Sequence, residues 1–162
     1  MSIIKHQSGW VIVASIIVAY ALLIIPLPEE LGYARPEFAL LAIIYWCIAL
    51  PERVGVISAW MVGLFQDALQ GTMIGLHALT FAIVAYIAVT FYHRIRVSPL
   101  WSQCLTILVL MLLHQLLFRW IYDFSGRPIS DLYYWSASVF SAVMWPVVFS
   151  SLRSMRRRFD VK

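Results

Sequence analysis

The chain has 162 residues, of which 62% are hydrophobic and only 12% are charged, and its mean hydropathy is +0.84. Soluble domains carry about one quarter charged residues, so this composition excludes a soluble globule and predicts a membrane protein made of apolar helices. The net charge of +4 lies largely in one C-terminal basic run, which is typical of a membrane-surface segment, so no nucleic-acid partner is expected.

An apolar run at about residues 9–25 predicts the first helix. It follows Lys5 as in a signal peptide, but the small residues Ala19 and Ala21 lie in its middle, so an uncleaved membrane helix is expected. Prolines at the boundaries then delimit further helices. These are predicted at about residues 36–50, 54–70, 74–92, 99–121 and 132–152. The prediction is therefore an all-α integral membrane protein, with one six-helix transmembrane domain over residues 1–162.

The distribution of Lys and Arg predicts the orientation of the six helices. One set of connecting segments holds nine of the 12 basic residues: Lys5, Arg53, Arg94, Arg96, Arg153, Arg156, Arg157, Arg158 and Lys162. The opposite set holds three, Arg35, Arg119 and Arg127. Cytoplasmic segments of membrane proteins are enriched in Lys and Arg, so both termini are expected in the cytoplasm. The arginines from Arg153 to Arg158 are expected to rest on anionic lipid or to contact a cytoplasmic partner.

The segment Gly63–Gly75, G-L-F-Q-D-A-L-Q-G-T-M-I-G, contains the one acidic residue embedded in an apolar span, Asp67. Three interpretations are open: a carboxylate that reaches interfacial water, a buried polar group that fixes helix packing, or a group that handles a ligand or proton. Gly63, Gly71 and Gly75 share a four-residue spacing with Asp67, which permits close helix packing, but Gly71 also suits a helix C-cap and Gly75 a turn.

The fifth predicted helix carries polar residues at the depth expected for Asp67. We predict that Asp67, with Gln66 and Gln70, pairs with a cluster on that helix formed by His114, Gln115 and Arg119. His77 is close enough in the sequence to join this cluster, and Arg119 also has Asp123 four residues away.

Catalytic and metal-binding motifs are not found in the sequence. No nucleophile has a base beside it, and His77, His93 and His114 lack metal-ligand spacing, so no catalytic residue, metal or cofactor is expected. Cys47 and Cys104 lie inside apolar runs and are expected to be small buried thiols.

Several motifs resemble the rod shape-determining MreD family. They are R-P-E-F-A-L-L at residues 35–41, Y-W-C-I-A-L-P-E-R-V-G at residues 45–55, the Gly63–Gly75 segment, M-W-P at residues 144–146, and the basic tail. The resemblance covers essentially the whole chain. It implies a non-enzymatic, multi-pass protein of the bacterial inner membrane that supports rod shape and side-wall peptidoglycan synthesis.

The same resemblance implies partners and a fold. The expected partners are an MreC-like bitopic periplasmic protein and other members of the elongation complex: an MreB-like actin homologue, a RodA-like glycan polymerase and a class B penicillin-binding transpeptidase. The family is also similar in fold to the substrate-binding subunits of energy-coupling-factor transporters. This likeness leaves a second hypothesis open, a vitamin-like small-molecule binder, because fold alone does not determine function.

Overall fold

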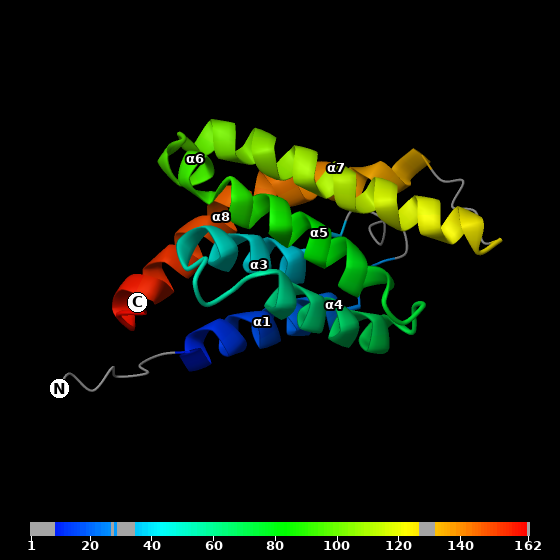
Figure 1. Cartoon of the computed structure of the whole chain (residues 1–162), viewed down its shortest axis with the longest axis horizontal. Coiled ribbons are helices and arrows are strands. Elements are labelled where there is room, and N and C mark those ends of the chain that lie inside the picture. Colours follow the sequence, from blue (N-terminus) through cyan, green and yellow to red (C-terminus); the bar gives the residue numbers. More distant parts are fainter. Residues whose placement is uncertain (1–8, 27, 29–34, 127–131, 162) are drawn as a thin grey trace.

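The computed structural model describes residues 9–26, 28, 35–126 and 132–161 (Figure 1). Lys5, Arg127 and Lys162, which entered the charge argument, lie outside these residues. Every regular element in the described part is helical, which confirms the all-α prediction. The elements are α1 (Gly9–Ile24), α3 (Phe38–Ala49), α4 (Val56–Gln70), α5 (Leu76–Thr90), α6 (Tyr92–Val97), α7 (Leu100–Phe124), a 3₁₀ turn η1 (Leu132–Trp135) and α8 (Ser136–Arg158).

Most predicted helix boundaries differ from the observed ones by a few residues, and two regions differ in structure as well. The helix expected to end at residue 92 ends at Thr90, and the separate short helix α6 follows it. The last helix begins with a 3₁₀ turn and continues to Arg158 rather than ending at residue 152. Arginine favours helices, and positive charge is stabilised at a helix C-terminus, so the basic residues extend α8 rather than ending it.

Two segments, Leu100–Phe124 and Tyr133–Arg158, are long and apolar enough to cross a membrane by length and composition. The helices α1, α3 and α5 are apolar but shorter. The number of crossings, six, therefore remains a prediction.

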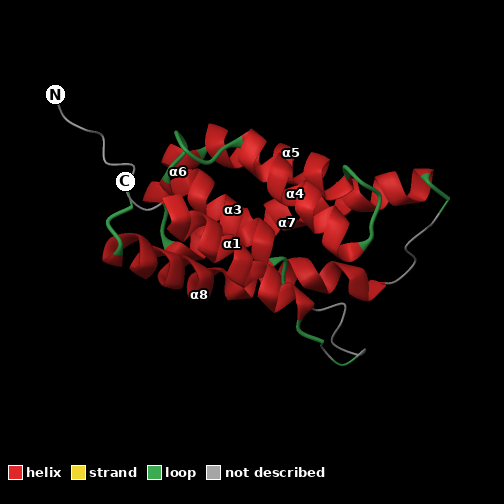
Figure 2. Ribbon diagram, turned by 90° about the horizontal axis from the view of Figure 1, so that it is seen from below, coloured by secondary structure: helices red, strands yellow, loops and turns green. Residues whose placement is uncertain are grey.

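Helix α3 forms the centre of the molecule, surrounded by the other helices (Figure 2). Eleven of its 12 residues, Ala39 to Ala49, are buried. A helix that is apolar on every side is stable only where it is covered on every side. This explains why the shortest of the main helices is also the least exposed.

Helix α7 shows the opposite pattern, with one buried stripe on a 25-residue helix. The stripe repeats at helical spacing and includes three polar residues; its members are Gln103, Ile107, Leu110, Met111, His114 and Gln115. Large apolar side chains such as Trp101, Leu105 and Val109 lie on the exposed surface instead. Polar residues inside and apolar residues outside are expected of a helix that faces lipid.

Helices α4 and α5 form a close antiparallel hairpin, seen side by side in Figure 1. Gly71 ends α4 in the left-handed conformation, with φ 63°, as the sequence predicts for a C-cap. Gly63 lies against the backbone of α5: a Cβ atom there would be 2.5 Å from Cα of Ala78. The glycine therefore permits the close approach of the two helices, and this approach positions the residues at their shared end.

The core also contains a buried hydrogen bond between α1 and α3. The indole Nε1 of Trp46 donates to the hydroxyl of Ser15 over 2.9 Å, and the Trp46 side chain is fully buried. An indole N–H left without an acceptor in such a place is destabilising.

Replacing Ser15 by alanine is expected to lower the free energy of unfolding by about 1–3 kcal/mol, the range for a buried donor that loses its partner. Thermal melting of the purified protein in detergent would measure the change. Trp46→Phe, alone and combined with Ser15→Ala, completes a double-mutant cycle: Ser15→Ala should cost less in the Trp46→Phe background, because no indole donor remains there. A melting temperature for Ser15→Ala equal to that of the wild-type protein would contradict the prediction.

Candidate functional site

Asp67 lies in the last turn of α4, is fully buried, and accepts hydrogen bonds from the start of α5. Its carboxylate accepts from the backbone N–H groups of Gly75 at 2.8 Å and His77 at 3.0 Å. The hydroxyl of Thr72 donates to the same carboxylate over 2.8 Å, and Nδ1 of His77 lies 2.8 Å from Oδ1. A carboxylate near these free N–H groups satisfies donors that have no partner within the helix.

The predicted partner of Asp67 on the fifth helix is therefore wrong. Within the described residues, its hydrogen-bond partners all come from residues 72–78 of the same hairpin, and none of them is His114, Gln115 or Arg119. The physical reason is proximity: the Gly71–Gly75 turn returns the chain so tightly that the first N–H groups of α5 face the end of α4. His114 approaches this group indirectly, because its ring centroid lies 6.0 Å from that of His77.

The remaining residues of the predicted cluster have other partners. Nε2 of Gln115 donates to the carbonyl of Tyr134 over 2.7 Å, and the hydroxyl of Ser138 donates to Oε1 of Gln115. Arg119 and Asp123 form a half-exposed ion pair at 3.8 Å on α7. Gln115 thus joins α7 to the start of α8, and Arg119 is satisfied on its own helix.

Gln66 has a partner that the sequence did not indicate. Its side chain is fully buried, and Nε2 donates to Oε2 of Glu37 over 2.9 Å. Glu37 precedes the first residue of α3, so this bond joins α4 to the start of the central helix. The R-P-E motif around Glu37 was noted in the sequence, but nothing in it indicated which helix the carboxylate would face.

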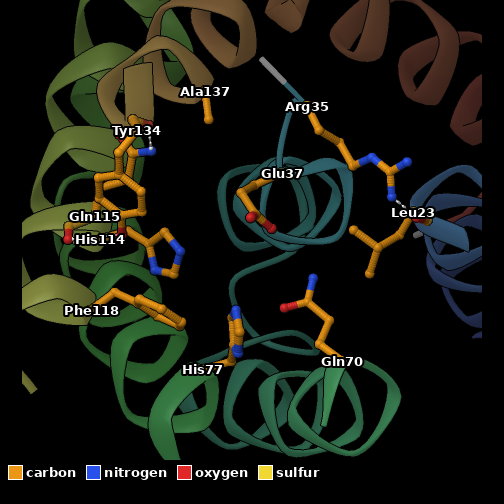
Figure 3. A pocket seen from close by; sticks show the side chains of 10 residues that line it. All are labelled: Leu23, Arg35, Glu37, Gln70, His77, His114, Gln115, Phe118, Tyr134 and Ala137. Carbon is orange, nitrogen blue, oxygen red and sulfur yellow. Dashed lines mark hydrogen bonds between the residues drawn. The ribbon is translucent and has the colours of Figure 1, made fainter. Parts of the chain in front are cut away.

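A cavity of about 480 Å³ opens beside these groups (Figure 3). It is lined by Leu23, Arg35, Glu37, Gln70, His77, His114, Gln115, Phe118, Tyr134 and Ala137. In Figure 3 the side chains of Glu37, His77 and His114 extend toward one space, whereas the guanidinium of Arg35 extends away from Glu37. Arg35 donates to the backbone carbonyls of Leu23 and Ile25 at the end of α1. The cavity therefore combines a carboxylate, two imidazoles and two amides, contributed by the start of α3 and by α4, α5 and α7.

The basic residues of the tail lie at the other end of the molecule, the end that also carries α6 (Figure 1). Arg153 and Arg156 of α8 line a hollow of about 180 Å³ together with Arg96 of α6. The guanidinium of Arg153 also lies 5.8 Å from the ring centroid of Phe149. Arg157 and Arg158 are exposed beyond the hollow. Arginines from two distant segments thus form one positive surface.

Comparison with known proteins decides the family. A family model described as rod shape-determining protein MreD matches residues 5–155, nearly the whole chain. The chain belongs to the MreD family. The rod shape-determining protein MreD of Haemophilus influenzae is 28% identical over 150 residues, which are 91% of this chain and 91% of that protein. No solved structure matches the chain.

Membership in the MreD family confirms the resemblance noted in the sequence motifs. The Gly63–Gly75 segment, which carries much of that resemblance, forms the second half of α4 and the turn into α5, and its Gln70 lines the cavity. In this MreD-family chain, that segment also contains the buried Asp67 and two of its hydrogen-bond donors, Thr72 and Gly75.

Proposed function

We propose that the chain is a non-enzymatic scaffold of the bacterial inner membrane that supports rod shape and side-wall peptidoglycan synthesis. The observation that carries this proposal is the match to the MreD family over residues 5–155. The apolar exposed faces of α7 and α8 support it, since such faces suit lipid or the transmembrane helix of a partner.

The buried polar groups support a structural rather than a catalytic use. The hydroxyl of Ser15 donates to the carbonyl of Ile12, that of Thr80 to the carbonyl of Leu76, and that of Ser138 to Gln115. Hydroxyls engaged in this way stabilise helices and helix contacts, and are not presented to a substrate.

The partner we propose is an MreC-like bitopic periplasmic protein, within a complex that also contains an MreB-like actin homologue, a RodA-like polymerase and a class B transpeptidase. The positive surface of Arg96, Arg153 and Arg156 is proposed to contact anionic lipid headgroups, each basic residue contributing about 1 kcal/mol near such a membrane. Both proposals place the chain as a connection between the membrane and the periplasmic part of the complex.

Depletion of the chain in its rod-shaped host is expected to give round cells, because side-wall synthesis loses a connecting component. Cell width and length measured by microscopy during depletion would test this, with re-expression of the wild-type chain as the control. Affinity purification from the same membranes should recover the bitopic partner. Persistent rods, together with purification that lacks that partner, would count against the scaffold.

One observation favours a second candidate, a small-molecule binding subunit: the 480 Å³ cavity lined by polar groups. Specific ligand sites are concave and contain a few convergent polar groups. Native mass spectrometry of the purified chain distinguishes the two candidates. An organic molecule bound at one copy per chain would support the binder and would oppose a role limited to scaffolding.

A further inference from the structure

Three metal-ligand side chains from three helices meet in the cavity. Glu37 at the start of α3, His77 of α5 and His114 of α7 each place one ligand atom within 4.8 Å of the others. We propose that Glu37, His77 and His114 bind a divalent transition-metal ion, with Zn²⁺ the best match to these ligands. Two imidazoles and a carboxylate, with a further position open to water, form a common zinc ligand set.

Two of the three ligands are already oriented by neighbouring groups. Asp67 accepts a hydrogen bond from Nδ1 of His77 at 2.8 Å, so Nε2 carries the free lone pair. Metal-binding histidines almost always donate their other ring N–H to such a group. Gln66 likewise donates to Oε2 of Glu37 at 2.9 Å and leaves Oε1 available. The arrangement thus contains the supporting groups of a metal site as well as its ligands.

The third ligand has an unsatisfied atom. Nδ1 of His114 is buried and has no hydrogen-bond partner among the residues that the structure describes. Buried polar atoms of native proteins nearly always have a partner, which is a protein group, a water molecule or an ion. We therefore expect a group in the cavity to bind this imidazole. Because the aromatic side chains Phe81 and Phe118 cover the ring, that group must approach from the cavity side.

The charges of the site balance around a divalent cation. Glu37 and Asp67 are the acids beside the two imidazoles, and Arg35, the cation among the described lining residues, is turned toward the carbonyls of Leu23 and Ile25. A doubly charged ion with two nearby carboxylates gives a neutral cluster, which lowers the cost of charge in a poorly hydrated interior.

The ligand atoms of Glu37, His77 and His114 must move slightly closer together to bind one ion. Zn–N and Zn–O bonds of about 2.1 Å in a tetrahedron put ligand atoms about 3.4 Å apart. The three ligand atoms lie within 4.8 Å of one another, so each pair must approach by at most about 1.4 Å. Rotation of the half-buried Glu37 side chain can shorten its distances to the two imidazoles. The bound ion would then join α3, α5 and α7 at one end of the molecule.

The test uses the full chain, purified in detergent with an affinity tag that lacks histidine, and stripped with a chelator. Co²⁺ serves as the spectroscopic probe and Zn²⁺ as the ion measured by elemental analysis. We expect one ion per chain, the visible absorption of four-coordinate Co²⁺, and a higher melting temperature with Zn²⁺. Glu37→Gln and His114→Gln should each weaken binding by at least about 100-fold, and Gln66→Ala by about 10-fold.

His93→Gln is the matched control, because His93 is an exposed histidine on α6, away from the cavity. The His93→Gln variant should take up one metal ion per chain with the same affinity as the wild-type chain. No stoichiometric uptake by the wild-type chain, or equal uptake by Glu37→Gln and His114→Gln, would overturn the proposal. Should these variants fail to fold, pulsed electron paramagnetic resonance of Cu²⁺ in the wild-type chain decides: two coordinated imidazoles support the site, and fewer overturn it.

Discussion

Replacing Gly63 by alanine is expected to destabilise the protein by about 3 kcal/mol or more, because the new methyl group meets backbone rather than a movable side chain. The added Cβ would lie 2.5 Å from Cα and 2.6 Å from N of Ala78, and 2.6 Å from the carbonyl carbon of His77. Relief requires the whole of α5 to move away from α4. His77 would move with it, so the cavity should also lose its shape.

Thermal melting in detergent and the amount of folded protein in membranes would measure the effect. Gly9→Ala is the matched control, since no atom lies within 4 Å of a Cβ placed there, at the exposed start of α1. The Gly9→Ala variant should have the same melting temperature as the wild-type protein. If the Gly63→Ala variant has the same melting temperature and membrane abundance as Gly9→Ala, then α4 and α5 are not in close contact at Gly63.

Replacing Asp67 by asparagine is expected to cost roughly 2–6 kcal/mol, because at least two buried donors then face an amide N–H₂ instead of a carboxylate oxygen. If the N–H₂ takes the place of Oδ2, these donors are the backbone N–H groups of Gly75 and Ala78. If it takes the place of Oδ1, they include the backbone N–H of His77 and the hydroxyl of Thr72. The change in volume is negligible, so the loss would report hydrogen bonding and charge alone. We expect a large fall in membrane abundance and, in the host cell, partial loss of rod shape.

Asp123→Asn is the control for this substitution, because Asp123 is an acid on α7 whose side chain is 42% exposed. Its loose ion pair with Arg119 should contribute less than about 1 kcal/mol, as exposed pairs do. Abundance of both variants is read by immunoblotting of membranes, and stability by melting of the purified chain. An Asp67→Asn protein as abundant and stable as Asp123→Asn would exclude a structural role for the buried carboxylate.

Much of the local structure could be predicted from the sequence. Long apolar runs between prolines located the helices, and Gly71 was expected as the C-cap that it forms. Boundaries were less accurate where the deciding interaction was not local. Thr90 ends α5 and the short basic helix α6 follows, although the apolar and aromatic run of the sequence extends to Tyr92.

The site was only half predictable. Asp67 was singled out because a carboxylate in an apolar span is costly, a property of one residue and its immediate neighbours. Its partners were assigned to the fifth helix by expected depth, and this failed because two groups at one depth can still face different directions. Gln66 was grouped with the same cluster, but its partner proved to be Glu37, 29 positions away.

The sequence by itself determined that this is an all-helical membrane protein of the MreD family, with Asp67 as its most unusual residue. Composition and short motifs suffice for such conclusions, because hydrophobic content and turn chemistry act over a few residues. Only the tertiary structure decided that Glu37, His77 and His114 meet in one cavity, since they come from three helices with no common spacing. Their meeting depends on how closely α4 packs against α5, and α5 against α3 and α7, which is set by side-chain shape in three dimensions.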